Sequence, residues 1–115
     1  MFSSIEELHS GLQLRYGSFQ EELPEQKMAF RYLTGNEKVL ELGGNIGRNS
    51  LVIASILNKY SKGNDKNLVV MESCNDSFNK LNENRDINNL NLLIPKNKDA
   101  YCSLECVNKF LKKKL

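Results

Sequence analysis

The sequence predicts an α/β fold in which a parallel sheet of about three strands is flanked by helices. Short, continuously apolar runs alternate with longer segments of helical periodicity, a pattern typical of buried parallel strands joined by helical crossovers. A cluster of glycines also follows the first apolar run directly, where a parallel strand would turn into its helix. The 115 residues are expected to form one domain, with a helical segment over 1–35 and a β-α-β-α-β-α core over 36–115.

Three apolar runs predict the strands. The first, residues 39–42, is expected to be buried on both faces apart from Glu41. The second is the continuous run at 68–71, and the third, at 90–94, ends before Pro95. Because crossover helices keep successive strands parallel, these runs predict half of a doubly wound, Rossmann-like sheet with helices on both faces.

Helical periodicity covers the segments before, between and after these runs. In the first segment, Pro24 either occupies a first helical turn or separates two short helices. After the glycines, Gly63 is expected to cap the C-terminus of the next helix in the left-handed conformation. Asn75 or Asp76 is expected to cap the helix after that. The predicted helices lie within residues 18–33, 51–60, 76–87 and 101–115.

Composition narrows the class of protein. The net charge of +2 argues against a nucleic-acid partner. No stretch approaches the roughly 20 apolar residues that cross a bilayer, and we expect a cytoplasmic protein without a membrane partner. The cysteines Cys74, Cys102 and Cys106 are odd in number, which favours reduced thiols. A closed metal site needs four ligands, and only Cys74 and the distant His9 could be added to the closely spaced pair Cys102 and Cys106, so no metal site is expected.

The glycines Gly43, Gly44 and Gly47 occupy the turn after the first predicted strand. Glycine there permits a positive φ and a close approach by a ligand, while the N–H groups at the helix start face the site. A tight turn without a ligand is the alternative. Three glycines within five residues, after a buried strand, favour the ligand site. Their spacing is not the G-x-G-x-x-G of dinucleotide enzymes.

Two carboxylates accompany this turn. Glu41 lies two residues before the first glycine, and a cofactor ammonium or backbone amides would offset the cost of burying it. Glu72 follows the second predicted strand. Its two acceptor oxygens suit the adjacent hydroxyls of a ribose. The alternative is that Glu72 is simply a charged residue at the end of a strand. Together with the glycine turn, Glu72 favours a site for the nucleoside end of a cofactor.

The runs VLELGGNIGRNSL and LVVMES resemble the first two cofactor-binding motifs of class I S-adenosylmethionine-dependent methyltransferases. The version Gly-Gly-Asn-Ile-Gly is similar to that of the FkbM branch, and the asparagine-rich run at 84–91 is similar to the approach to the third strand in that branch. The resemblance covers residues 36–94. It implies S-adenosylmethionine as the cofactor and a methyltransferase-like function.

The resemblance also implies roles for individual residues. Glu41 would face the amino group of the cofactor, the turn would shape the pocket around methionine and ribose, and Glu72 would hold the ribose hydroxyls. Ser73 and Cys74 would lie beside the adenine, and Asp99 would accept from the adenine amino group. The implied cofactor-binding residues are Glu41, Gly43, Gly44, Asn45, Gly47, Glu72, Ser73 and Asp99.

In that family the sheet is larger, and the segment that binds the methyl acceptor follows the fourth strand. This chain is therefore expected to be the cofactor-binding half. It would be a truncated or degraded product, a minimal binding remnant, or a sheet that a second copy or a partner chain completes. The methyl acceptor and the catalytic residues are left open. The alternative is a catalytically inactive Rossmann-like module that binds another protein, and a dinucleotide enzyme is disfavoured by the glycine spacing.

Overall fold

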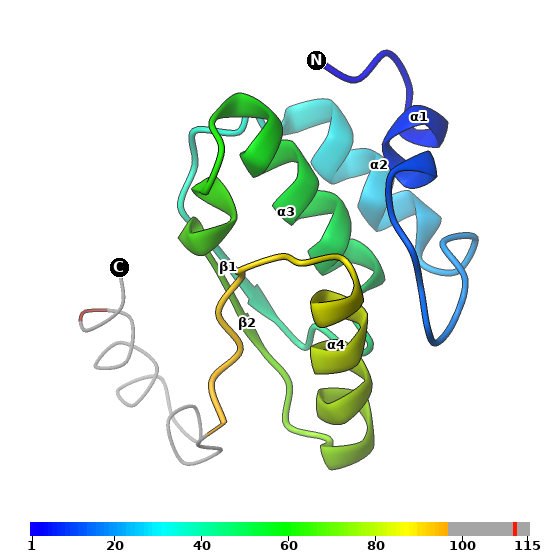
Figure 1. Cartoon of the computed structure of the whole chain (residues 1–115), viewed down its shortest axis with the longest axis vertical. Coiled ribbons are helices and arrows are strands. Elements are labelled where there is room, and N and C mark those ends of the chain that lie inside the picture. Colours follow the sequence, from blue (N-terminus) through cyan, green and yellow to red (C-terminus); the bar gives the residue numbers. More distant parts are fainter. Residues whose placement is uncertain (97–111, 113–115) are drawn as a thin grey trace.

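The computed structural model describes residues 1–96 and Lys112 (Figure 1). The predicted helix at 101–115, together with Asp99, Cys102 and Cys106, lies outside the described residues. The elements, in chain order, are α1 (Ile5–Ser10), α2 (Leu23–Tyr32), β1 (Val39–Leu42), α3 (Arg48–Tyr60), the 3-10 helix η1 (Asn64–Asn67), β2 (Leu68–Met71) and α4 (Asn75–Ile87).

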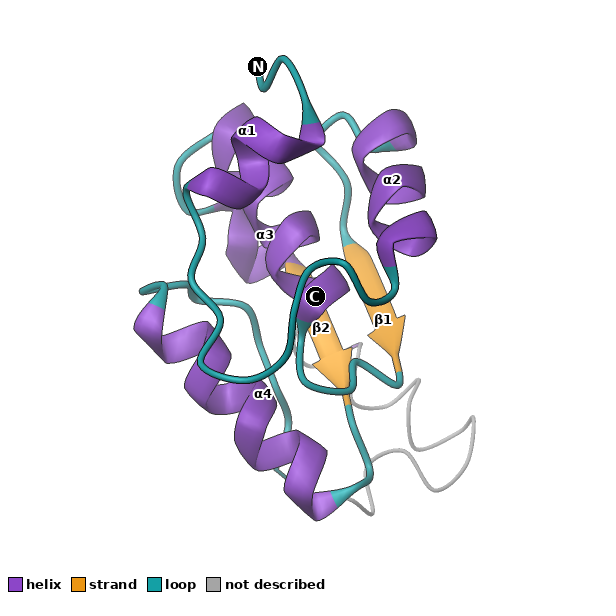
Figure 2. Cartoon of the chain, turned by 90° about the vertical axis from the view of Figure 1, so that its right-hand side faces the viewer, coloured by secondary structure: helices purple, strands orange, loops and turns teal. Residues whose placement is uncertain are grey.

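The two strands pair in parallel, as the apolar runs predict. Their register joins Val39 to Leu68 and Leu42 to Met71, so both strands end at the same level. In Figure 2 the two arrows point the same way, and the connections that leave them lie at the same end of the sheet. The structure thus confirms a mixed α/β fold with a parallel sheet and flanking helices, and this sheet has two strands within the described residues.

The third predicted strand is reduced to one parallel bridge, between Val69 and Leu93. Two backbone hydrogen bonds, of 2.8 and 2.9 Å, connect Leu93 to β2. On one side of this bridge, the amide of Asn91 donates to the carboxylate of Asp65 at 2.6 Å rather than to a strand. On the other side, Pro95 has no N–H to donate. The backbone of this segment therefore pairs with the sheet at a single residue.

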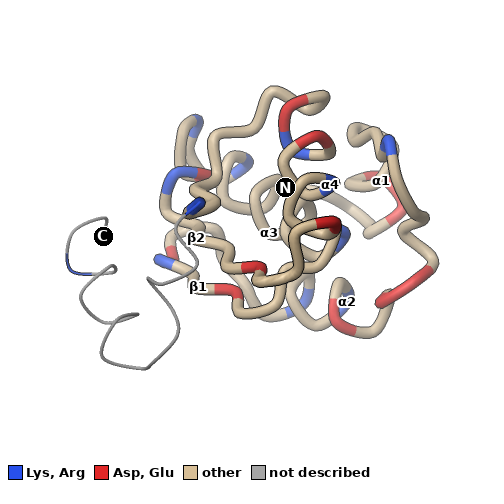
Figure 3. Tube along the Cα trace, turned by 90° about the horizontal axis from the view of Figure 1, so that it is seen from below, with Lys and Arg blue, Asp and Glu red and all other residues tan. Residues whose placement is uncertain are grey.

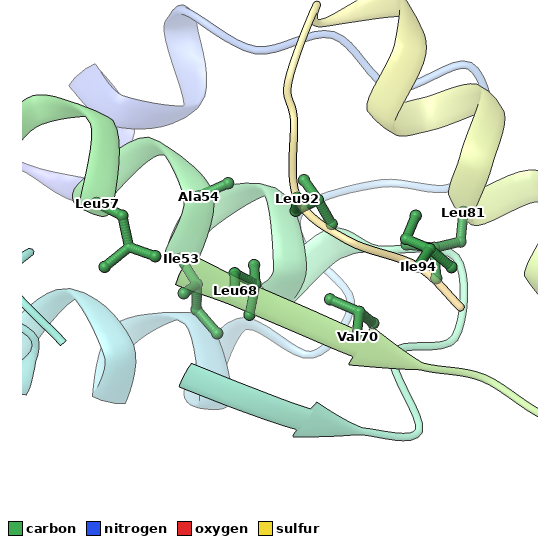
Figure 4. Packing of buried hydrophobic residues seen from close by; sticks show 8 residues of the cluster. All are labelled: Ile53, Ala54, Leu57, Leu68, Val70, Leu81, Leu92 and Ile94. Atoms are coloured by element: carbon green, nitrogen blue, oxygen red, sulfur yellow. The ribbon is translucent and has the colours of Figure 1, made fainter. Parts of the chain in front are cut away.

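Helix α3 is buried on two faces, and the core forms around it. Ile53, Ala54 and Leu57 face the sheet and α4 (Figure 4), in a cluster that also contains Leu68, Val70, Leu81, Leu92 and Ile94. Val52 and Ile56 face the other way, toward Leu8 of α1 and the partly buried apolar residues Phe19, Phe30 and Leu33. Helix α3 thus separates the sheet from the α1–α2 pair.

The opposite face of the sheet carries Val69 and Met71, with Leu40 and Leu93 beside them. No helical residue of 1–96 joins this cluster, whereas helices were expected on both faces. β1 also differs from its prediction, because Leu42 is 67% exposed. Successive side chains of a strand point to opposite faces, so Glu41 faces α3 while Leu42, at the strand end, faces solvent.

Two helix caps also differ from the predictions. Helix α3 ends at Tyr60 with an extended cap residue, and Gly63 takes its left-handed conformation (φ 94°) at the start of η1 instead. Helix α4 begins at Asn75 with Cys74 as its N-cap, because Glu72 binds the Cys74 amide at 2.7 Å and keeps that residue extended. In the part of the chain that the structure describes, no helix is long and apolar enough to cross a membrane.

Candidate functional site

The glycine turn lies across the ends of both strands. The carbonyl of Met71, the last residue of β2, accepts the amides of Gly43 at 2.8 Å and Gly44 at 3.1 Å. The turn then closes with a hydrogen bond of 3.0 Å from the Gly47 amide to the Gly44 carbonyl, and Gly47 becomes the N-cap of α3. The parallel register therefore brings the turn against the last residue of β2.

The backbone of the turn alternates into the left-handed region. Gly43 has φ 72°, Asn45 has φ 54° and Gly47 has φ 99°. Glycine adopts such angles without a β-carbon clash, and asparagine tolerates them better than most residues. The sequence Gly-Gly-Asn-Ile-Gly therefore places a suitable residue at every left-handed position.

The three glycines have different surroundings. A β-carbon at Gly44 would lie 2.2 Å from the Val70 side chain, and one at Gly47 would lie 2.6 Å from the Leu81 side chain. These two glycines are therefore required by the packing of the turn on β2 and α4. At Gly43, which is exposed, an added β-carbon would meet nothing within 4 Å. Gly43 thus has open space above it, as a site for a ligand requires.

Glu72 joins the turn to the segment that follows β2. One carboxylate oxygen accepts the Asn45 amide at 2.8 Å and the other accepts the Cys74 amide at 2.7 Å. The side chain is largely buried, with 9% of its residue surface exposed. A carboxylate oxygen can accept more than one hydrogen bond. The predicted meeting of the glycine turn and Glu72 is present in the structure.

Glu41 points into the interior, toward the start of α3. Its oxygens accept the Ser50 hydroxyl and, at 3.3 Å, the Asn49 side-chain amide. Burial raises the pKa of the Glu41 carboxyl above its ordinary value, the bonds from Ser50 and Asn49 oppose that shift, and the nearby charge of Glu22 adds to it. Glu41 therefore ties β1 to α3.

Ser73 and Cys74 are exposed beside Glu72. The backbone N–H of Ser77 is the main group that lowers the pKa of the Cys74 thiol, which is free. A thiol with a lowered pKa has more of the reactive thiolate at neutral pH. The rate at which this thiol reacts can therefore be used to detect a ligand near Glu72.

A segment that the sequence did not single out lies against the turn. Residues 11–22, between α1 and α2, contact it through Gly17, where an added β-carbon would lie 2.4 Å from the Ile46 side chain. Arg48, the first residue of α3, forms ion pairs with Glu21 at 3.0 Å and Glu22 at 2.9 Å. These contacts join residues about 30 positions apart, so the local sequence pattern carries no trace of them.

Other candidate sites lie away from the turn. A pocket of about 340 Å³, lined mainly by apolar residues and including Phe2 and Lys59, lies at the C-terminal end of α3, whereas the turn lies at its N-terminal end. Positive and negative residues are interspersed over the view of Figure 3. Within residues 1–96 and Lys112, no group of three or more His, Cys, Asp or Glu side chains is arranged to hold a metal ion.

The arrangement at the turn combines open space at Gly43, the acceptor oxygens of Glu72 and the N-terminus of α3. Such a set can accept hydroxyl hydrogen bonds and allow close contact with a ligand. Comparisons with protein-family models, with curated proteins and with solved structures found no match for this chain.

Proposed function

We propose that this domain binds S-adenosylmethionine at the glycine turn and is the cofactor-binding half of a methyltransferase-like protein. One observation carries the proposal: where two adjacent parallel strands end, Gly43 has open space at the position of a β-carbon, and Glu72 binds the amide of Asn45 in the same turn. In open α/β sheets, ligands bind in the crevice outside these strand ends. The methyl acceptor and the catalytic residues are not assigned.

The residues of the turn fit the nucleoside end of this cofactor. Both oxygens of the Glu72 carboxylate accept backbone amides at this end of the sheet, and a carboxylate with two acceptor oxygens suits the paired ribose hydroxyls. Gly43 and Asn45 would line the ribose and methionine, and Ser73 would lie beside the adenine. When bound, the cofactor supplies an electrophilic methyl group on its sulfonium. The contribution of this chain is to hold the cofactor in one orientation, which accounts for much of the rate in such transfers.

Glu41 has a supporting role in the proposed site. Its bonds to Ser50 and Asn49 fix the end of β1 against the start of α3, which sets the position from which the turn departs. The remaining lone pairs of this carboxylate are the acceptors that the cofactor amino group would use. Gly44 and Gly47 act through packing, because their missing β-carbons let the turn approach β2 and α4.

The proposed fold is one half of a Rossmann-like sheet, with the segment at Leu93 as its third strand. The observation in favour is that Leu93 bridges β2 in parallel, on the side of β2 away from β1. The strand order would then be third, second, first, with β1 at the edge where further strands would pair.

Calorimetric titration tests the cofactor proposal. The wild-type protein should bind S-adenosylmethionine and S-adenosylhomocysteine, and Glu72→Ala should weaken binding by about 1 to 3 kcal/mol, because partner groups lose their acceptor. Asp76→Ala is the matched control, since it removes an exposed carboxylate four residues away that pairs with Lys80. If the folded wild-type protein gives no heat with either ligand at millimolar concentration, the proposal fails.

A second candidate function is a module that binds a partner strand. It is favoured by Leu42, which is 67% exposed at the end of β1, and by β1 having a single neighbouring strand within the described residues. Open strand edges pair readily with other chains. Light scattering during size-exclusion chromatography tests completion by a second copy: a dimer supports it, and a monomer at all concentrations contradicts it.

A further inference from the structure

Residues 11–22, here named the strap, run from the end of α1 to the start of α2 and cross α4 on the way. Two asparagines hold the strap, Asn84 within α4 and Asn88 at the C-cap of that helix. Asn88 accepts the amide of Gln13 and donates to the carbonyl of Gln13, both at 2.8 Å. Asn84, one helical turn earlier, holds the next part of the strap. The strap is thereby fastened to α4 at two successive points.

Asn84 differs from Asn88 because it also reaches the glycine turn. Its side-chain oxygen accepts the amides of Arg15 at 2.7 Å and Tyr16 at 3.2 Å. Its side-chain nitrogen donates to the carbonyls of Tyr16 at 3.2 Å and Ile46 at 2.9 Å. Asn84 has no exposed surface, and these bonds use all four hydrogen-bonding positions of its amide. One buried side chain therefore joins the strap to the turn.

The strap also packs directly on the turn, where Gly17 contacts Ile46. Gly17, with φ 83°, lies so close to Ile46 that an added β-carbon would be 2.4 Å from the end of that side chain. The strap therefore reaches Ile46 twice, through the carbonyl bonded to Asn84 and through the side chain beneath Gly17. Both contacts lie next to Asn45.

Asn45 is the residue that these contacts affect. It holds φ 54°, a left-handed angle that asparagine tolerates better than most residues and that its neighbours here support. On its N-terminal side the Asn45 amide donates to Glu72 at 2.8 Å, and on its C-terminal side the Ile46 carbonyl accepts from Asn84. The conformation that aims the Asn45 N–H at Glu72 is thus fixed from both sides.

We propose that Asn84 is a positioning residue, which locks the glycine turn to the strap and so holds the Asn45 amide on Glu72. This inference rests on the proposed function in one respect, namely that the ligand held by the positioned turn is the nucleoside end of S-adenosylmethionine. The coupling of strap and turn is a property of the ligand-free chain. When the strap is displaced from Ile46, the Asn45–Glu72 bond opens more often.

Amide hydrogen exchange in the full chain, followed by NMR, tests the coupling without a ligand. Asn84→Ala removes the link between the strap and the turn, and Gly17→Ala displaces the strap without touching α4. In both variants the Asn45 amide should exchange about tenfold faster than in wild type, which corresponds to the free energy of about one hydrogen bond. In Asn88→Ala, which keeps the link to Ile46, and in Gly11→Ala, where a β-carbon meets only an ordinary contact at 3.7 Å, Asn45 should exchange as in wild type.

The amide of Val70, which donates to Leu93 at 2.8 Å, reports on the sheet and should exchange unchanged in all four variants. Unchanged Asn45 exchange in both Asn84→Ala and Gly17→Ala would overturn the inference. Equal acceleration of Asn45 and Val70 in both variants would also overturn it, because the two residues would then only support folding.

Titration of the same proteins with S-adenosylhomocysteine separates this inference from the proposed function. If the coupling and the ligand are both correct, Asn84→Ala and Gly17→Ala should bind about tenfold more weakly than wild type, and the two control variants should not. If Asn45 responds to the strap as expected but the wild-type protein binds no ligand, the coupling stands and the proposed function fails.

Discussion

A β-carbon added at Gly44 would lie 2.2 Å from Val70, whereas one added at Gly43 would meet open space. The two adjacent glycines are therefore needed for different reasons, Gly44 for packing and Gly43 for open space. Gly44 lets the turn pack on β2, and Gly43 leaves open space at the strand ends while holding φ 72°. Substitutions at the two positions should consequently affect different properties of the protein.

Gly44→Ala should lower the free energy of unfolding by about 1 to 3 kcal/mol, because the new methyl group overpacks the contact with Val70. Gly43→Ala should cost about 1 kcal/mol through its left-handed backbone and should mainly weaken binding of S-adenosylmethionine. Urea unfolding and calorimetric titration of both variants measure the two effects. Equal loss of affinity in the two variants, after correction for folding, would contradict the assignment of Gly43.

The buried carboxyl of Glu41 gives the stability a pH dependence of definite sign. Burial raises its pKa in the folded state above the ordinary value of 4.5, so the folded protein favours the protonated form. The stabilising contribution of that form is complete below pH 4.5 and is lost as the pH rises through the folded pKa. Above that window, the fold holds an ionised carboxylate between β1 and α3.

Glu41→Gln removes this ionisation and should therefore gain stability relative to wild type as the pH rises from about 4 to 8. Glu37→Gln is the matched control with the opposite sign, because the Thr34 amide lowers the pKa of Glu37 and its contribution is lost as the pH falls. Urea unfolding across this range measures both. A difference between Glu41→Gln and wild type that does not change with pH would refute the proposed titration.

Cys74 offers a reporter of ligand binding next to Glu72. Because the Ser77 N–H lowers the pKa of this exposed thiol, it should react with iodoacetamide faster than an unperturbed cysteine at pH 7. Bound S-adenosylmethionine should slow the modification of Cys74, and mass spectrometry of the peptide that contains it measures the rate. Modification at an unchanged rate, with ligand at saturation, would place the ligand away from Glu72.

At the scale of elements, helix α4 packs against the glycine turn. Leu81 has no exposed surface, and its side chain fills the space that a β-carbon at Gly47 would need. The same helix provides Asn84, which bonds to Ile46. The start of α3 and the glycine turn therefore depend on the position of α4 through both an apolar contact and a polar one.

Leu81→Ala should lower the free energy of unfolding by about 2 to 5 kcal/mol, because it leaves a cavity between α4, β2 and the turn. Lys80→Ala, one residue earlier on the exposed side of α4, should change it by less than about 0.5 kcal/mol. Thermal and urea unfolding measure both. Comparable effects at the two positions would show that α4 does not support this core.

The elements that local pattern specifies were predictable. β1 and β2 follow from their continuous apolar runs, and the approach of the glycine turn to Glu72 follows from their parallel register. The third strand was not predictable from its apolar residues. Asp65, a residue 26 positions away, takes the amide of Asn91 that a strand would have used, and periodicity contains no information about that bond.

In the candidate site, too, some features follow from the local sequence pattern and others depend on distant residues. That Glu41 faces α3 follows from strand alternation, since it shares a face with Val39, but its bonds to Ser50 and Asn49 depend on where α3 begins. The strap was not predictable at all. Asn84 contacts residues that are 68 and 69 positions away in the sequence, and such a contact is set by the folded arrangement of α4 and the turn.

At the scale of the whole molecule, three layers are stacked: the sheet, helix α3 and the α1–α2 pair. The α1–α2 pair covers one face of α3, the sheet covers the other, and the strap returns from α1 across α4 to the glycine turn. The apolar pocket beside Phe2 and Lys59 lies at the far end of α3. The proposed cofactor site and this pocket can therefore be distinguished by any measurement with residue resolution.

An NMR titration of the amide spectrum with S-adenosylmethionine tests the central claim most directly. The account predicts that the signals of residues 43–47 and 72–74 shift together and saturate, while those of Phe2, Lys59 and Tyr60 at the pocket do not move. An unchanged spectrum at millimolar ligand, or shifts confined to the pocket residues, would contradict the claim that the glycine turn binds this cofactor.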